Sequence, residues 1–388
     1  MPTADQEIHK VLTFKSGNFV FSRRFDQQKT ETELRVFHAC YDIIASLPVL
    51  PHFAAFLDED LIRKSIFSTA ALEGNPLDEQ AVGALLGQEE PTATANNFEQ
   101  EILNLKAAHD TFILAAIDAK PLLLSEDLIK AVHAAITIGV NDAAISPGLY
   151  RNTPVQVGNP EHGGTYVPPK ILEDIKTLMA AFVDWINGEA LLRTDPVIRA
   201  ALAHYHLAKI HPFRDGNGRT ARMIEAMILA AAGYRYIPST LWNSYYLEIH
   251  DYYIAFSRAE KNADDSVQPF LDFYFNALSD SLEELRARIV EGTKPLLLRD
   301  YVAYLKNQTR ELSTRQHQLV ELLMTSKVPF DYKYLKTTLP FKLLYQHVSE
   351  KTIKRDIAKL QDLGLLVKAN EKYRINYDFR QLDALFPA

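Results

Sequence analysis

The chain has 388 residues, of which 47% are apolar, 23% are charged and 10% are aromatic. This is the composition of an ordinary globular protein, and the length is typical of two or three domains. A formal net charge of −7 excludes a chain coated as a whole with positive charge for nucleic acid. A single cysteine, Cys40, excludes an intrachain disulfide and a zinc cluster of several thiolates.

The sequence carries no visible signal for secretion or for a membrane. Residues 1–10 lack a basic stretch followed by an apolar one, and every apolar run falls far short of the ~20 residues of a membrane helix. We therefore expect a cytoplasmic protein without a membrane partner. The charge is uneven, because residues 295–388 carry 16 Lys and Arg against 10 Asp and Glu, whereas the rest of the chain carries 26 against 39.

Most of the chain is expected to be helical. Residues 1–35 predict an irregular arm, in which residues 13–26 form a short hairpin or an extended segment. Apolar residues at three- and four-residue spacing then predict helices over residues 31–47, 57–75, 96–117, 125–137, 170–187, 195–210 and 219–233. Residues 148–169 interrupt this pattern, because two β-leaning pieces flank a turn rich in Gly, Asn and Pro, which predicts a β-hairpin.

The C-terminal segment differs from the rest. Residues 313–326 predict one helix, and residues 349–364 predict another between the N-cap Ser349 and the closing Gly364. The apolar stripe of this second helix consists of Ile353, Ile357 and Leu360. Residues 365–377 alternate like two strands joined by a tight turn, so the whole predicts a winged helix-turn-helix. Its last helix would expose four basic side chains, Lys351, Lys354, Arg355 and Lys359.

Residues 211–220, HPFRDGNGRT, concentrate polar chemistry between two predicted helices. The Gly-Asn-Gly of residues 216–218 falls at the N-terminus of the second helix. Backbone N–H groups there, freed by the conformational range of glycine, form an anion-binding nest that the helix dipole strengthens. Arg219 and Arg222 are three residues apart, so both can reach one phosphate. The stretch therefore predicts a phosphate site.

Two further side chains add chemistry to this stretch. Asp215 offers a hard oxygen ligand, which suits Mg²⁺ bridging phosphate oxygens. A histidine has an ordinary pKa of about 6.5, so His211 can accept a hydroxyl proton near neutral pH. Together these groups predict nucleotidyl or phosphoryl transfer to a hydroxyl. A polar interhelical turn without function is the alternative that the residues alone leave open.

Other motifs fit this stretch less well. Residues 216–221 match G-x-G-x-x-A, but a dinucleotide fold requires a strand before that turn, and here a helix precedes it. A phosphate loop of the form G-x-x-x-x-G-K-[ST] does not occur. His204, His206 and His211 do not suggest a shared metal ion, since helix positions two apart point away from each other. We expect packing or capping roles for His204 and His206.

The pattern H-P-F-x-D-G-N-G-R-x-x-R over residues 211–222 resembles the full signature of the Fic family, whose best-known members transfer AMP from ATP to protein hydroxyls. Residues 149–169 resemble the family's flap, the hairpin that holds a target segment over the site. Residues 241–256 resemble the aromatic region that packs near adenine. The resemblance covers about residues 30–285. It implies a mainly α fold, a Fic-type helical bundle with a β-hairpin flap, to which the winged helix-turn-helix is appended.

The resemblance also implies roles for single residues. His211 would be the base, Phe213 a buried anchor of the loop and Asp215 the Mg²⁺ ligand. The ATP phosphates would be bound by Gly216, Asn217, Gly218, Arg219 and Arg222. The flap would include Val155, Val157, Gly158, Thr165 and Tyr166. Tyr252 and Tyr253 would lie near adenine, and a role as core aromatics is the alternative.

A second motif, STAALEGN at residues 68–75, resembles the family's inhibitory helix. Thr69, Glu73 and Gly74 match its pattern. Glu73 could pair with Arg222 and remove the contact of that arginine with the γ-phosphate, so that ATP would bind poorly aligned for in-line attack. The alternative is a surface acid beside a helix end.

These expectations combine into one hypothesis. Residues 1–110 would carry the arm and the inhibitory helix (about 60–74), residues 111–290 the Fic core with its flap (about 150–168) and residues 295–388 the winged helix. The function would be Mg²⁺- and ATP-dependent AMP transfer to a Ser, Thr or Tyr hydroxyl of a target protein and of the chain itself, restrained by Glu73. Removal of AMP at the same site, transfer of another phosphate-containing group and DNA binding by the winged helix are the alternatives. The partners would be ATP, a target protein that the sequence does not identify and a second copy in a homodimer, with DNA less favoured.

Overall fold

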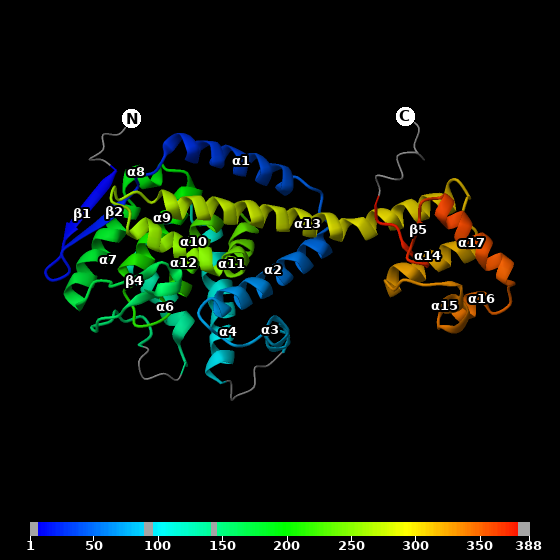
Figure 1. Cartoon of the computed structure of the whole chain (residues 1–388), viewed down its shortest axis with the longest axis horizontal. Coiled ribbons are helices and arrows are strands. Elements are labelled where there is room, and N and C mark those ends of the chain that lie inside the picture. The colour runs from blue at the N-terminus through cyan, green and yellow to red at the C-terminus, as the bar shows by residue number, and fades with distance from the viewer. Residues whose placement is uncertain (1–6, 89–95, 141–145, 379–388) are drawn as a thin grey trace. The chain divides into compact units, whose positions relative to one another are not determined.

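The computed structural model describes residues 7–88, 96–140 and 146–378. The chain divides into two compact units, Met1–Arg286 and Ala287–Ala388 (Figure 1). Residues 1–110 therefore belong to the same unit as the segment that carries the motif. None of the helices in the described ranges combines the length and the apolar character that a membrane span requires.

The first unit begins with a hairpin of β1 (Ile8–Leu12) and β2 (Asn18–Ser22), which pair antiparallel. Phe21 on β2 is fully buried, and its ring packs against Phe182, Trp185 and His206. The predicted arm thus contains a hairpin, and its aromatic face ties it to the helical body.

Helices make up most of the first unit, which confirms the mainly α prediction. They are α1 (Gln27–Ala45), α2 (Pro51–Ala71), α3 (Glu79–Leu86), α4 (Asn97–Ala108), α5 (Leu114–Ile117), α6 (Glu126–Thr137), α7 (Leu172–Ile186), α8 (Glu189–Leu192), α9 (Pro196–Ile210), α10 (Asn217–Ala231), α11 (Ile237–Leu247) and α12 (Ile249–Glu260). A π-helical turn, His109–Ile113, separates α4 from α5, so the helix expected over residues 96–117 is not a single α-helix. The helix predicted from residue 57 begins six residues earlier, because Pro51 occupies the first turn, where a missing N–H costs nothing.

Helix α10 is the centre of this unit, and it contacts α2, α5, α6, α9 and α11 (Figure 1). Nearly every one of its residues is buried, including the charged Arg219, Arg222 and Glu225. A helix buried on all sides needs partners for its polar groups, and those partners form the site described below.

The flap region contains a short hairpin of β3 (Val157–Asn159) and β4 (Gly164–Tyr166), in which Gly158 lies opposite Thr165. A 3-10 turn, Pro160–His162, connects the two strands. Val155 lies two residues before β3 and takes no part in the pairing.

Helix α13 (Gln268–Asn307) runs from the first unit into the second, with Pro295 inside it. The second unit continues with α14 (Thr314–Ser326), α15 (Tyr332–Thr337), α16 (Phe341–Tyr345), α17 (Glu350–Asp362), β5 (Leu366–Ala369) and β6 (Lys372–Ile375). The predicted stripe of α17 is confirmed, because Ile353, Ile357 and Leu360 are fully buried. The name winged helix remains a prediction for this arrangement.

The basic face of α17 is partly neutralised by neighbouring carboxylates. Lys354 lies 3.2 Å from Glu350, and Lys359 lies 3.5 Å from Glu311. Lys351 and Arg355 are exposed. Pairing of this kind weakens the electrostatic attraction on which nonspecific DNA binding depends.

Candidate active site

The motif loop connects α9 to α10 through two left-handed residues. His211 ends α9 with φ 52°, and Gly216 precedes α10 with φ 77°. The side chain of Asn217 closes the loop, because its Oδ1 accepts from the backbone N–H of Phe213 and its Nδ2 donates to the carbonyl of the same residue, both at 2.9 Å. Both polar atoms of this side chain are thus engaged in holding the loop.

His133 on α6 also supports this loop, although it belongs to no motif recognised in the sequence. Its ring stacks on the fully buried Phe213 with 3.7 Å between ring centroids. Its Nδ1 accepts from the backbone N–H of Gly148, and its Nε2–H donates to the carbonyl oxygen of Asp215, both at 2.9 Å. A histidine on the apolar face of a predicted helix was the available signal.

We expect His133→Phe to keep the stacking and to destabilise the chain. Phenylalanine leaves the N–H of Gly148 and the carbonyl of Asp215 without partners, at a cost of about 1–3 kcal/mol for each group. A lower thermal unfolding midpoint, followed by circular dichroism, would agree. The same change at the exposed His52 is the control, and equal midpoints for the two variants would contradict the role of His133.

The first backbone N–H groups of α10 have no partners within the helix. The carboxylate of Glu73, two residues after the end of α2, lies beside them. A Cβ atom at Gly218 would collide with Oε1 of Glu73. The same oxygen is 2.7 Å from Nη2 of Arg222. Glu73 therefore lies where the positive end of the helix dipole and an arginine together attract an anion.

Arg222 is held on several sides by neighbouring oxygens. Its Nε donates to the hydroxyl of Thr69 at 2.8 Å, and its Nη2 donates to the carbonyl of the same residue at 3.2 Å. Thr69 and Glu73, matched to the inhibitory motif in the sequence, thus both contact Arg222, while Gly74 has the left-handed φ of 87° that turns the chain away. Arg222 is only 1% exposed, so these bonds compensate the burial of its charge.

Charges on both partners favour the ion pair between Glu73 and Arg222. Burial by itself would raise the pKa of Glu73, but the charges of Arg222 and Arg219 outweigh it and leave that pKa below its ordinary value. Burial by itself would lower the pKa of Arg222, but the charge of Glu73, its hydrogen bond to the guanidinium and the neighbouring tyrosines together outweigh burial and raise that pKa. Glu73 is therefore an ionised carboxylate at neutral pH.

A buried polar chain extends from Arg222 into the core. Nη1 of Arg222 donates to the hydroxyl of Tyr252 at 3.4 Å, and that hydroxyl lies 2.9 Å from Nε2 of His204. Nδ1 of His204 lies 2.9 Å from Oε1 of Glu225. Tyr252 is 3% exposed, so its hydroxyl serves this chain while its ring contributes to the cavity wall.

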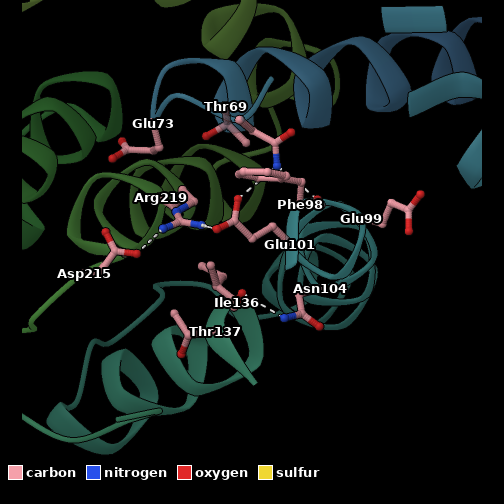
Figure 2. Close-up of polar contacts among 12 residues, drawn as sticks. Thr69, Glu73, Phe98, Glu99, Glu101, Asn104, Ile136, Thr137, Asp215 and Arg219 are labelled. Atoms are coloured by element: carbon pink, nitrogen blue, oxygen red, sulfur yellow. Dashed lines mark hydrogen bonds and ion pairs between the residues drawn. The ribbon is translucent and has the colours of Figure 1, made fainter. Parts of the chain in front are cut away.

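Arg219, which the resemblance assigned to ATP phosphate, is paired with carboxylates of the chain. It is 3% exposed and pairs with Asp215 at 2.7 Å and with Glu101 of α4 at 3.2 Å (Figure 2). It does not line the cavity described below, whereas Arg222 and Gly218 do. A phosphate contact of Arg219 stays a prediction.

Asp215 is the member of this group that reaches solvent, with 46% of its side chain exposed. Within the described ranges, no three His, Cys, Asp or Glu side chains gather closely enough to hold a metal ion by themselves. One exposed carboxylate beside an anion nest fits Mg²⁺, which commonly takes one or two carboxylates and completes its shell with water and phosphate oxygens.

His211 has the protonation state that a general base requires. Burial lowers its pKa to about 4, and the charge of Arg151 acts in the same direction, so the ring is neutral at pH 7. Nδ1 lies 3.3 Å from the carbonyl of Ala208. Since a carbonyl only accepts, Nδ1 carries the ring hydrogen, and Nε2 is left with a free lone pair.

Arg151 connects the motif loop to the start of the flap region. Its Nε donates to the carbonyl of His211 at 2.7 Å, and its Nη1 donates to the carbonyl of Thr153 at 2.9 Å. The side chain is buried, and burial lowers its pKa to about 10. Arg151 therefore positions the backbone of His211, and its charge helps to keep the His211 ring neutral.

A cavity of about 440 Å³ lies beside the motif loop, and Asp215, Arg219 and Arg151 are not part of its wall. Its wall is formed by Glu73, the strands β3 and β4, part of the motif and α12, and it includes Gly158, Thr165, His211, Arg222 and Tyr253. The turn of the flap is attached to α12, because Ser257 donates to the carbonyl of Gly163 at 2.9 Å and Lys261 contacts the same oxygen. Tyr253 donates from its hydroxyl to the carbonyl of Leu72 at 3.0 Å, next to Glu73.

Two buried histidines, His133 and His206, and the half-buried His211 couple the stability of the chain to pH. Burial lowers the pKa of His206 to about 3 and the pKa values of His133 and His211 to about 4, against about 6.5 in an unfolded chain. As pH falls, the unfolded chain therefore takes up protons that the folded chain does not. Their stabilising contribution is complete above about pH 6.5 and is lost toward pH 4.

We accordingly expect the thermal unfolding midpoint to fall steadily between pH 6.5 and 4. His206→Gln, which keeps a donor for the carbonyl of Ser22, should flatten this dependence. His52→Gln, at an exposed position, should follow the parent chain. A midpoint that does not change from pH 7 to pH 5 would contradict the prediction.

This chain is similar to proteins of a known family. Residues 123–229 match the Fic/DOC family. Protein adenylyltransferase fic-1 of Caenorhabditis elegans is 29% identical over 259 residues, which are 64% of this chain and 48% of that protein. Protein adenylyltransferase Fic of Nematostella vectensis is 30% identical over 209 residues, 54% of this chain and 45% of that protein. The chain thus matches about half the length of these relatives.

Solved structures show that the fold is shared. A Fic family protein from Desulfovibrio desulfuricans G20 superposes with a TM-score of 0.54 at 18% identity, over 91% of this chain and 97% of that one. A Fic domain containing signaling protein from Bacteroides thetaiotaomicron VPI-5482 gives a TM-score of 0.53 at 24% identity, over 66% of this chain and 96% of that one.

Proposed function

Because this chain carries a Fic/DOC family segment, we propose that it transfers AMP from ATP to a Ser, Thr or Tyr hydroxyl of a protein, and that Glu73 restrains the transfer. One observation carries the proposal. The carboxylate of Glu73 lies at the N-terminus of α10 and pairs with Arg222, in the cavity that also contains the neutral base His211. An internal carboxylate in an anion site acts as a stand-in for phosphate until ATP displaces it.

The residues of the chain divide the work of the reaction. The acceptor oxygen attacks the α-phosphorus of ATP while Nε2 of His211 takes its proton, and the bond from the α-phosphorus to the bridging oxygen breaks to release pyrophosphate. Backbone N–H groups of residues 216–218 and the guanidinium of Arg222 bind the phosphates. Asp215 would hold Mg²⁺, which would neutralise charge on the phosphate oxygens. The flap strands β3 and β4 would hold the acceptor segment by backbone pairing.

Label transfer from two forms of ATP tests this proposal. The Glu73→Gly chain is incubated with Mg²⁺ and ATP labelled at either the α- or the γ-phosphate, and protein-bound label is measured. Label from the α-phosphate and none from the γ-phosphate is expected. Label from the γ-phosphate would instead indicate phosphoryl transfer, and label from neither would contradict the proposal.

Removal of AMP is a second candidate for the same cavity. The observation that favours it is the ionised Glu73 beside His211, since a carboxylate in this place can orient a water molecule toward a phosphoester. Protein labelled by the Glu73→Gly chain is the test substrate. Loss of label on adding the unmodified chain, and no loss with the Glu73→Gly chain, would support removal.

A further inference from the structure

Glu101 is a carboxylate that lies outside the motif and still contacts it. It projects from α4, and its Oε1 lies 3.2 Å from Nη1 of Arg219 (Figure 2). Its other oxygen, Oε2, accepts from Nδ2 of Asn75 at 3.0 Å. The side chain is 16% exposed and does not line the cavity.

Arg219 needs this carboxylate because of its burial. Its side chain is 3% exposed, and Nε has no partner within the described residues. Arg219 forms direct ion pairs with Glu101 on one side and with Asp215, at 2.7 Å, on the other, and the nearby charge of Glu73 also favours it. A buried guanidinium that lost its counter-ions would strongly destabilise the site.

The two carboxylates are not equivalent. Asp215 is 46% exposed at the motif loop, whereas Glu101 is fixed among protein groups. Asn75 fixes it, since the same Nδ2 also donates to the carbonyl of Phe98 at 3.0 Å. When Asp215 turns from Arg219 toward a cation, Glu101 therefore remains as the counter-ion of the arginine.

We propose that Glu101 is a positioning residue that releases Asp215 for Mg²⁺ by holding Arg219 itself. This inference rests on the proposed function, which assigns Mg²⁺ to Asp215. Without a carboxylate at position 101, Asp215 would be the remaining direct ion-pair partner of a buried arginine, and a divalent cation would have to compete with that ion pair. Asn75 extends the support to the inhibitory segment, because it follows Glu73 by two residues.

The experiment measures ATP binding by calorimetry on the full chain over a series of MgCl₂ concentrations. Glu73→Gly/His211→Asn is the parent, because it lacks both the competing carboxylate and the base. Glu101→Gln is expected to raise the MgCl₂ concentration for half of the magnesium-dependent tightening by about tenfold or more. ATP affinity without magnesium should stay within about twofold of the parent.

Two further variants of the parent separate charge from general damage. Glu101→Asp keeps the charge and is expected to shift the magnesium requirement less than Glu101→Gln. Glu99→Gln is the matched control on the same helix, because glutamine also accepts the capping bond that Glu99 takes from the N–H of Asn96. It should bind ATP and magnesium as the parent does.

The inference would be overturned if magnesium did not tighten ATP binding by the parent, or if Glu101→Gln and Glu99→Gln required the same MgCl₂ concentration. It would also be overturned if Glu101→Gln lost ATP affinity equally with and without magnesium. In an Asp215→Asn background, Glu101→Gln should cause no additional shift, and a full shift there would also overturn it. Failure of the proposed function is seen separately. It would appear as absence of label transfer by the Glu73→Gly chain while the magnesium shift persists.

Discussion

Glu73→Gly is expected to raise self-labelling from α-labelled ATP by about ten- to hundredfold over the unmodified chain. The change removes a charge-assisted bond to the buried Arg222 and frees the N-terminus of α10 for phosphate. Such bonds contribute about 1.5–3 kcal/mol, and each 1.4 kcal/mol corresponds to a factor of ten. Since α2 ends at Ala71, glycine at position 73 does not interrupt a helix.

Two variants control this prediction. Glu73→Gln keeps the shape and removes the charge, so its labelling should lie between those of the unmodified chain and Glu73→Gly. Asp118→Gly removes an exposed carboxylate just after α5 and should leave labelling unchanged. If Glu73→Gly labelled no more than Asp118→Gly, restraint by Glu73 would be wrong.

His211→Asn in the Glu73→Gly chain is expected to lower labelling by about 10²–10⁴-fold, the usual contribution of a general base. Asparagine is preferred to alanine here, because residue 211 has a φ of 52° and asparagine tolerates that left-handed conformation. The amide lacks a nitrogen that can take the proton of the acceptor. Initial rates of label incorporation at saturating ATP provide the measurement.

Binding of ATP separates the role of the base from loss of the site. His211→Asn should bind ATP with magnesium within about threefold of the Glu73→Gly chain, because the proposal assigns phosphate binding to α10 and Arg222. A threefold change in affinity corresponds to about 0.7 kcal/mol of binding free energy, since each factor of ten corresponds to about 1.4 kcal/mol. Lys209→Gln, two residues earlier and also in the cavity wall, tests whether any change near the loop has the same effect. Retention of labelling by His211→Asn would exclude His211 as the base.

Local spacing predicted α1, α2, α4, α6, α7, α9, α10, α14 and α17, but it did not predict α3, α8, α11, α12, α13, α15 or α16. The stripe of α17 was read from Ile353, Ile357 and Leu360, which are all fully buried. The hairpin at residues 148–169 exists, but its strands have three residues each and begin at Val157, so Val155 lies outside it. Helix α13 is continuous from Gln268 to Asn307, and the division into two compact units falls inside it, between Arg286 and Ala287.

Apart from the pairing of Glu73 with Arg222, which the resemblance suggested, the partners of the motif residues were not predicted, because they are distant in the sequence. His133 reaches Asp215 across 82 positions, and Arg222 reaches Thr69 across 153. The sequence pattern assigns polarity to these side chains but does not assign partners. Asn217 illustrates the limit, since the sequence suggested no partner for its side chain, which is bonded to the backbone of Phe213 in the structure.

The sequence by itself determined the helical class, the motif loop and the pairing hypothesis for Glu73, because each depends on residues a few positions apart or on one resemblance. The tertiary structure alone decided which charges are satisfied. It placed Glu73 on the N-terminus of α10, put Arg219 between Asp215 and Glu101, and left Nε2 of His211 with a free lone pair. The physical reason is that burial removes water as a partner, so each buried charge takes whichever polar group the fold brings within reach.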